Sequence, residues 1–373
     1  MNDIEEFIRW AKLQGVQLNG IEPAKIPGRG IGVTASRSLK PGEVILDVPM
    51  QAVRSLHAIS KSVLQQLPAG LSFHGILAAD LALDTTAGFD SWKKLLPSQT
   101  DFPLSMPFTW PEELQSLLPK AVSNTVQKQH AKFKCQWAAV KKAFPSLNRD
   151  EYLYYWLLVN TRTFYLEIPQ LEAFPWEDKL ALLPVADLFN HAADQGCHVE
   201  YDADGYTITA SRQYEAGDEV VASYGNHSND YLLAEYGFAM SENKWDNVCL
   251  DEVVMPRLTQ TQIKELENDG CGSPYTLIAG KGPSRQLVAV LRLLTPSDAS
   301  WPADGADVDE GPRLGATAKE LLKIVLNEAL EKAQNTRGKI HELTAGEAMQ
   351  RDMLHQRWEQ IESLISQAID RLS

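Results

Sequence analysis

The chain has 373 residues, of which 44% are hydrophobic and 23% are charged, and its formal net charge at pH 7 is −14. This balance argues against an intrinsically disordered chain and indicates a folded protein that buries a sizeable core in two or more units. The negative charge argues against a nucleic-acid backbone as the main ligand and favours a basic partner through long-range attraction.

The N-terminal residues predict an amphipathic helix and not a secretory signal. Ile4, Phe7 and Ala11 recur at helical spacing, and Asp3 could cap the helix. No basic region precedes an apolar run here, and the longest apolar run, 152–159, is too short to cross a bilayer. We therefore expect a protein that binds no membrane and works in the cytoplasm, with the nucleus as a second compartment. A monomer is a separate expectation.

The next part of the chain alternates between β-rich and helical patterns. Short strands separated by turn signals are predicted for 21–53, and strand signals return over 182–224. Between them, residues 57–164 carry apolar side chains at helical spacing. Two β-rich segments are thus expected to flank a helical insertion.

The pattern after about residue 250 is helical again. Two long helices are predicted at 318–333 and 345–372, and the second has one apolar stripe. Packing in a helical bundle is the expected use of this stripe, and an exposed coiled-coil surface is the alternative. A loop rich in Pro, Gly and Asp, 297–312, precedes these helices and includes the acidic run 304–310.

Cysteine spacing gives no sign of a zinc or disulfide framework. Cys135, Cys197, Cys249 and Cys271 lie far apart and form no CxxC pair. Four buried free thiols are the expectation.

Two arginine-bearing segments could serve a ligand. In the first, 28–32, glycines alternate around Arg29 and would allow positive φ or a close backbone approach, although a plain turn is also possible. No βαβ pattern follows, so this is not a dinucleotide fingerprint. In the second, 160–164, Arg162 lies between apolar segments and needs an anionic or polar partner. A structural ion pair and a ligand carboxylate both remain open.

Polar residues also punctuate the apolar run 184–191. Asp187, Asn190 and His191 must be paired if they are buried, so this segment either ties the core together or binds something polar. No second histidine or acidic residue completes a recognisable metal-ligand set, and no metal is expected. The chain also lacks the G-x-S-x-G elbow of many Ser-His-Asp hydrolases.

The fourth segment, 223–226, is followed closely by 236–238. A strand that ends at Tyr224-Gly225 and feeds a short helix would leave the phenol where a reacting group could reach it. The alternative is that Tyr224 is a tyrosine of the hydrophobic core with no part in catalysis.

Taken in order, these features resemble the SET methyltransferase family, in particular the branch typified by Rubisco large-subunit and ribosomal-protein lysine methyltransferases. Residues 28–30 with 41–43 resemble the opening of the SET domain, 187–191 its Asn-His segment, and 223–225 to 236–238 its closing segment. The zinc segment that closes many histone-directed SET enzymes is missing.

The resemblance implies an α+β fold with a β-rich SET domain, a helical insertion and an all-helical C-terminal substrate-binding domain. The expected parts are 1–55, with the N-terminal helix and the start of the SET domain; 56–160, the insertion; 161–245, the rest of the SET domain with the active site; and 246–373, the C-terminal domain.

The resemblance further implies S-adenosyl-L-methionine as cofactor and Tyr224 as the catalytic residue beside the transferred methyl group. The residues that would bind the cofactor are Arg29, Gly30, Arg162, Asn190, His191, Tyr224 and Phe238. The residues on the substrate side would be Arg162, Asp187 and Tyr236.

The implied activity is lysine methylation of a non-histone protein, with ribosomal proteins and translation factors as the expected basic substrates. Three alternatives stay open: histidine methylation on the same fold, a catalytically silent binding module, and an unrelated α+β scaffold.

Overall fold

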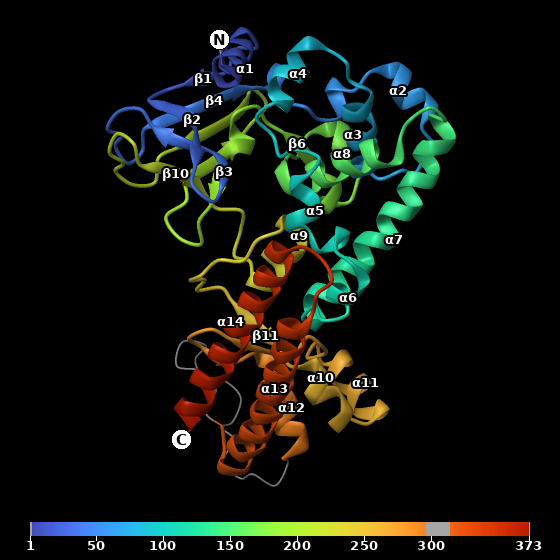
Figure 1. Ribbon diagram of the computed structural model, residues 1–373, viewed down its shortest axis with the longest axis vertical. Coiled ribbons are helices and arrows are strands. Elements are labelled where there is room, and N and C mark those ends of the chain that lie inside the picture. The colour runs from blue at the N-terminus through green and yellow to red at the C-terminus, as the bar shows by residue number, and fades with distance from the viewer. Residues whose placement is uncertain (1, 296–313, 373) are drawn as a thin grey trace. The chain divides into compact units, whose positions relative to one another are not determined.

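A computed structural model describes residues 2–295 and 314–372 of the chain. The chain divides into two compact units (Figure 1), and the helical insertion contributes to both. The first unit comprises residues 1–103 and 127–226, and the second comprises 104–126 and 227–373. The predicted loop 297–312, with its acidic run 304–310, lies outside the described residues.

Two four-stranded sheets form the β-rich part of the first unit, with strand orders β1-β4-β9-β8 and β2-β3-β10-β7, beside a β5-β6 pair. In the second sheet, β10 pairs antiparallel with β3 and parallel with β7, so that Asn190 lies opposite Val221 and His191 opposite Ala222. This register brings three segments that are far apart in sequence to one place. The strands are β1 Gln17–Leu18, β2 Ile21–Ile26, β3 Gly30–Ala35, β4 Val44–Pro49, β5 Thr163–Tyr165, β6 Leu180–Leu182, β7 Asn190–His191, β8 His198–Tyr201, β9 Gly205–Thr209 and β10 Glu219–Ala222.

The helices of the first unit include α3 and α8, which lie side by side and bury most of their side chains. The N-terminal helix α1 buries Phe7 and Ala11 as predicted, but its cap is Asn2. Asn2 and Glu5 form a reciprocal capping box, which places Asp3 inside the first turn. The helices are α1 Asp3–Leu13, α2 Lys61–Gln66, α3 Phe73–Leu83, α4 Ala87–Lys93, α8 Arg149–Arg162 and the 3₁₀ turns η1 Met50–Ala52, η2 Leu56–Ala58, η4 Pro169–Leu171, η5 Trp176–Asp178 and η6 Ala186–Leu188. Two further helices, α5 Asp101–Ser105 and α7 Lys120–Ala143, contain two of the three points where the chain passes between the units, and the third lies between Asn226 and His227.

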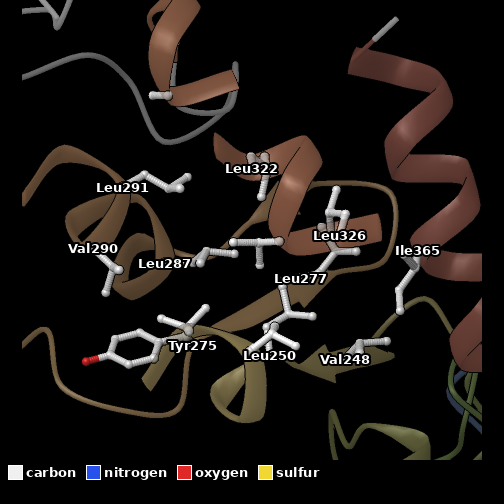
Figure 2. Close-up of a cluster of buried hydrophobic side chains, with 14 of the residues drawn as sticks. Val248, Leu250, Tyr275, Leu277, Leu287, Val290, Leu291, Leu322, Leu326 and Ile365 are labelled. Atoms are coloured by element: carbon white, nitrogen blue, oxygen red, sulfur yellow. The ribbon is translucent and has the colours of Figure 1, made fainter. Parts of the chain in front are cut away.

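The second unit is built around the two long helices predicted from the sequence, α13 and α14, which pack side by side (Figure 1). Leu354, Ile361 and Ile365 of the α14 stripe are buried, so the packing interpretation of the stripe is confirmed. Ile365 belongs to an apolar cluster with Leu322 and Leu326 of α13 (Figure 2). The helices of this unit are α6 Glu112–Gln115, α9 Asn229–Tyr236, α10 Asp251–Val254, α11 Gln260–Asn268, α12 Arg285–Leu294, α13 Ala316–Glu342 and α14 Ala348–Leu372, with the 3₁₀ turns η3 Pro107–Thr109 and η7 Met255–Arg257.

The C-terminal region is not all helical, contrary to the expectation from the sequence. It contains a three-stranded sheet of β11 Asn247–Cys249, β12 Thr276–Ile278 and β13 Gly282–Pro283. Strands of two or three residues are too short to show an alternating pattern, so hydrophobic periodicity does not predict them. Within the described residues, the α+β class with mainly helical C-terminal packing is otherwise confirmed.

The four cysteines are all free thiols, as expected, but they are not all buried. Cys197 and Cys271 are buried, Cys249 is half-buried and Cys135 is exposed, because α7 turns Phe133 and Gln136 inward and leaves Cys135 facing solvent. Within residues 2–295 and 314–372, no cluster of three or more His, Cys, Asp or Glu side chains could hold a metal ion. No helix in the same ranges is both long and apolar enough to span a bilayer.

Candidate active site

The glycine-rich turn between β2 and β3 has one open side and one tightly packed side. Gly28 and Gly30 have φ angles of 72° and 75°, and a Cβ on either would have no neighbour within 4 Å. At Gly32, by contrast, a Cβ would lie 2.6 Å from Ile26 and 2.8 Å from the Asn190 amide nitrogen. The alternating glycines therefore do two things: they set the turn, and they let Asn190 lie directly against the β3 backbone.

Arg29 connects this turn to β10 through a carboxylate and to β7 through a backbone carbonyl. Its guanidinium donates to Glu219 Oε2 at 2.7 Å and to the backbone carbonyl of His191 at 2.7 Å. The Asn190 amide donates to the second Glu219 oxygen at 2.8 Å. Glu219 thus joins Arg29 and Asn190, two of the predicted cofactor residues. In the sequence, Glu219 is only a polar residue at the start of a predicted strand, after the turn Ala216-Gly217, and nothing marks it as part of the site.

His191 and Tyr224 form the next layer of the site. His191 is buried, and its Nδ1 accepts the backbone N–H of Tyr224 at 3.0 Å, so that the neutral ring carries its proton on Nε2. The two rings stack with centroids 5.0 Å apart. The Tyr224 hydroxyl donates to the Phe189 carbonyl at 2.6 Å. These contacts fix the phenol from both ends.

The surroundings of Tyr224 keep its hydroxyl protonated at neutral pH. Burial raises the pKa of this hydroxyl above its ordinary value of 10, against the opposing influence of the positive charges of Arg162 and Arg29. Asp187 and Glu219 also act on it electrostatically. The phenol therefore lies within electrostatic reach of two arginines and two carboxyl groups, and it can donate one hydrogen bond while keeping lone pairs to accept others.

Asp187 is a buried carboxyl group at the edge of this network. The Trp92 indole donates to its Oδ2 at 2.9 Å, whereas Oδ1 is buried with no hydrogen-bond partner among the described residues. Burial raises the pKa of Asp187 to about 7, and the nearby positive charge of Arg162 only partly opposes this. Trp92, far away in the sequence, was not predicted as part of this site.

Arg162 bonds to the main chain of the same segment, since it donates to the Asp187 carbonyl at 2.6 Å. Arg162 forms no salt bridge within 4 Å with a described carboxylate, although its charge acts on the nearby Asp187 carboxyl, so the ion-pair and ligand interpretations of Arg162 both stay predictions. Two residues before Asp187, Val185 has φ 72°. A β-branched residue in this conformation stores on the order of 1–3 kcal/mol of strain, which is found mostly at functional sites.

Tyr236 and Phe238, the remaining predicted site residues, belong to the second unit. Tyr236 ends α9, and Gly237 caps the helix with φ 78°. The rings of Tyr236 and Phe238 are 6.3 Å apart, and Tyr231 lies 6.4 Å from Tyr236. Tyr231 in turn stacks on His227 at 4.1 Å. These four rings form an aromatic wall, and the roles of Tyr236 and Phe238 at the active site stay predictions.

The first unit thus brings Arg29, Arg162, Asp187, Asn190, His191 and Tyr224 together, with Gly30 on the adjoining turn. A family model described as SET domain matches residues 30–225, which include the β3, β7 and β10 segments of this network. The chain belongs to the SET-domain family. The resemblance stated from the sequence is confirmed, and the unrelated-scaffold alternative is wrong.

Several known SET proteins are similar to this chain. The ribosomal lysine N-methyltransferase set11 of Schizosaccharomyces pombe is 26% identical over 357 residues, which cover 92% of both chains. The rat N-lysine methyltransferase SETD6 is 28% identical over 62% of this chain and 53% of its own. The mouse actin-histidine N-methyltransferase is 25% identical over 77% of this chain and 52% of its own.

Two solved structures share the fold. The SET domain of LSMT bound to lysine and AdoHcy aligns with a TM-score of 0.64 at 16% identity, over 100% of this chain and 92% of that one. Rubisco LSMT bound to AdoMet aligns with a TM-score of 0.63 at 16% identity, over 100% and 93%. At this identity the likeness extends to the fold alone.

Proposed function

We propose that this protein is an S-adenosyl-L-methionine-dependent methyltransferase that modifies a lysine side chain of a non-histone protein. The observation that carries the proposal is the arrangement around Tyr224, a half-buried phenol fixed by His191 and the Phe189 carbonyl within a SET domain. Family membership and the lysine-methylating relatives support the enzyme class.

The residues around Tyr224 suit the cofactor. The guanidinium of Arg162 forms no salt bridge with a described carboxylate, so it can bind the carboxylate of a ligand. The open side of the 28–30 turn leaves backbone groups accessible. We assign Arg29 and Gly30 to the cofactor through backbone groups, and Asn190 and His191 to its adenine and amino-acid ends. Phe238 would pack on the adenine. When bound, the cofactor supplies a methyl group on a sulfonium for in-line displacement.

The protein's own contribution is to align the acceptor amine and to lower its pKa, so that the proton leaves to solvent water before methyl transfer. A lysine side chain has a pKa of about 10.4 in water and must lose its proton before it can act as a nucleophile. Desolvation in an apolar channel, with Tyr236 as one wall, lowers the pKa of an amine, so no strong general base is needed. The protonated Tyr224 hydroxyl can hold the nitrogen in line through its lone pairs, with Asp187 orienting the segment that carries Phe189.

The proposed partner is a basic protein. The net charge of −14 favours such a partner by long-range attraction, and ribosomal proteins and translation factors fit this chemistry. A monomer of the cytoplasm, and in part of the nucleus, would meet these substrates.

A second candidate function is methylation of a histidine ring nitrogen. It is favoured by one observation, namely that the similar mouse protein named actin-histidine N-methyltransferase aligns over 77% of this chain. Mass spectrometry of the modified substrate separates the two, since the mass added is the same but the modified residue differs.

The test is methyl transfer from labelled S-adenosyl-L-methionine to an extract of cells that lack this protein, separated into ribosomal and soluble fractions. The wild-type protein should label a discrete basic protein, and Tyr224→Phe should label it far less. Cofactor binding without any labelled protein in either fraction would favour the catalytically silent binding module. Absence of cofactor binding in calorimetry at near-millimolar ligand would overturn the proposal.

A further inference from the structure

Helix α14 carries a fully buried arginine that is shared between two carboxylates of the second unit. The side chain of Arg357 is 0% exposed; its Nε donates to Asp230 at 2.6 Å and one terminal nitrogen donates to Asp246 at 2.7 Å. The other terminal nitrogen donates to the Asn247 carbonyl at 3.2 Å. Asp230 is in the first turn of α9, and Asp246 immediately precedes β11. One guanidinium thus joins three segments.

A second set of bonds ties the same α9 end to the loop that follows the helix. Asp246 accepts the backbone N–H of Asn229 at 2.9 Å. The Asn229 amide donates to the Met240 carbonyl and to Gln360 of α14, each at 2.9 Å. Gln360 also donates to the Met240 carbonyl at 2.8 Å. Arg357 and Gln360, one helical turn apart on α14, therefore hold the start of α9 and the chain beyond Phe238 together.

Helix α9 is short, so fixing its first turn fixes its last residue. Tyr236 lies six residues after Asp230, about 9 Å along the helix axis. Leu232, Leu233 and Ala234 are buried, and at Gly237 a Cβ would lie 2.9 Å from Met106 and 3.0 Å from the Ser105 carbonyl. A shift of the first turn would therefore be transmitted along the helix to the Tyr236 ring, because close packing leaves little room to absorb it.

We infer that Arg357 is a positioning residue for methyl transfer, which acts by fixing α9 and hence the aromatic wall that includes Tyr236 and Phe238. The inference rests on the proposed function. A buried ion cluster is weak as a source of stability, because desolvation of the charges offsets most of their attraction, and in some proteins its use is to specify one geometry. Here the cluster holds two carboxylates on one guanidinium, an arrangement that matches the fork of arginine and not the single ammonium of lysine.

The test compares Arg357→Lys with a matched control on the same helix pair. Arg337 of α13 also reaches two carboxylates, Glu359 at 3.1 Å and Glu362 at 2.8 Å, but both belong to α14. For each variant we would measure the initial rate of label transfer from S-adenosyl-L-methionine to the protein labelled by wild type, cofactor affinity by calorimetry, and the number of methyl groups by mass spectrometry. Rates would be taken well below each melting temperature.

Arg357→Lys should lower the rate at saturating cofactor by about tenfold or more, and change cofactor affinity by less than about threefold, because a displacement of about 1 Å far from the chemistry is enough for such a loss. Arg337→Lys should stay within about twofold of wild type. A changed distribution of methylated products in Arg357→Lys would support the same conclusion, since Tyr236 is the proposed channel wall.

A folded Arg357→Lys with wild-type rate and products would overturn the role of Arg357 while leaving the proposed function intact. If wild type transferred no methyl group, the proposed function and this inference would both fall. Should Arg357→Lys not fold, Gln360→Met decides, because it removes the bonds to Asn229 and Met240 from a half-buried site without moving a charge. A lowered rate in this variant would support the inference, and an unchanged rate would overturn it.

Discussion

Replacing Asp187 by asparagine should change how the stability of the protein depends on pH. Burial raises the pKa of this carboxyl from 3.8 to about 7. A carboxyl whose pKa is higher in the folded than in the unfolded protein adds stability that is complete below about pH 4 and is lost as the pH rises through about 7. Three pKa units at about 1.4 kcal/mol each give a total of about 4 kcal/mol, of which about 2.5 kcal/mol falls between pH 5 and pH 8.

The substitution suits the site, because the asparagine carbonyl can still accept the Trp92 indole bond that Asp187 Oδ2 accepts at 2.9 Å. Urea unfolding followed by tryptophan fluorescence at pH 5 and pH 8 measures the effect as the difference between variant and wild type, so that other titrating groups cancel. Asp187→Asn should be more stable than wild type at pH 8 and should lose this advantage towards pH 5.

Asp178→Asn provides the matched control. Asp178 is equally buried but accepts the backbone N–H groups of Phe73 and His74 at 3.1 and 3.3 Å, so its replacement should destabilise the protein at pH 8. Parallel stability curves for wild type and Asp187→Asn, with no gain at pH 8, would refute the reasoning that desolvation dominates at Asp187.

Three further results are expected. Tyr224→Phe removes the hydroxyl that is held 2.6 Å from the Phe189 carbonyl and should lower turnover by about 10²-fold, while calorimetry shows little change in cofactor affinity; near-normal turnover would show that this phenol is only structural. Asn190→Ala should instead weaken cofactor binding itself, because it removes the amide that Gly32 and Glu219 position, and unchanged affinity would contradict that role. His74 shows the opposite pH behaviour to Asp187: burial lowers its pKa to about 3, so the stability that it contributes is present above about pH 6.5 and about 2 kcal/mol of it is lost by pH 5. Urea unfolding of His74→Gln should show a flatter acid limb than wild type, and an equally steep limb would contradict the prediction.

The segments of the site could be predicted from the sequence because each breaks a local pattern. Glycines alternate around Arg29, and polar residues interrupt the apolar run that ends at Asn190-His191. Such conflicts between local preference and surroundings are expected at functional sites. The structure adds the reason for one of them: Gly32 is required by the approach of the Asn190 side chain, a contact over 158 positions in the chain.

The partners of these residues could not be predicted in the same way. Glu219 lies at the start of a strand and Trp92 in a helical segment, and both fit their local patterns. Strand pairing and packing bring Glu219 and Trp92 to the site from distant parts of the chain, and the periodicity of hydrophobic residues carries no information about such contacts. The short strands β11 to β13 were missed for a related reason, since their pairing depends on tertiary packing and not on propensity.

The role of Arg357 was the hardest to predict from the sequence, because Arg357 is one charged residue on a helix whose apolar stripe is continuous without it. On pattern alone such a residue belongs on the solvent face, yet its side chain is 0% exposed and bonded to Asp230 and Asp246, which lie more than 100 positions earlier. Neither carboxylate has a sequence feature that marks it as a partner. Replacing Arg357, Asp230 and Asp246 together by apolar residues of similar size would often be neutral or stabilising, so stability alone does not explain a buried charge cluster at this position. What apolar residues could not do is hold α14 to the first turn of α9 through the directional bond to Asp230, and to the start of β11 through the bonds to Asp246 and the Asn247 carbonyl. It is this directional role that connects a residue near the C-terminus to the aromatic wall.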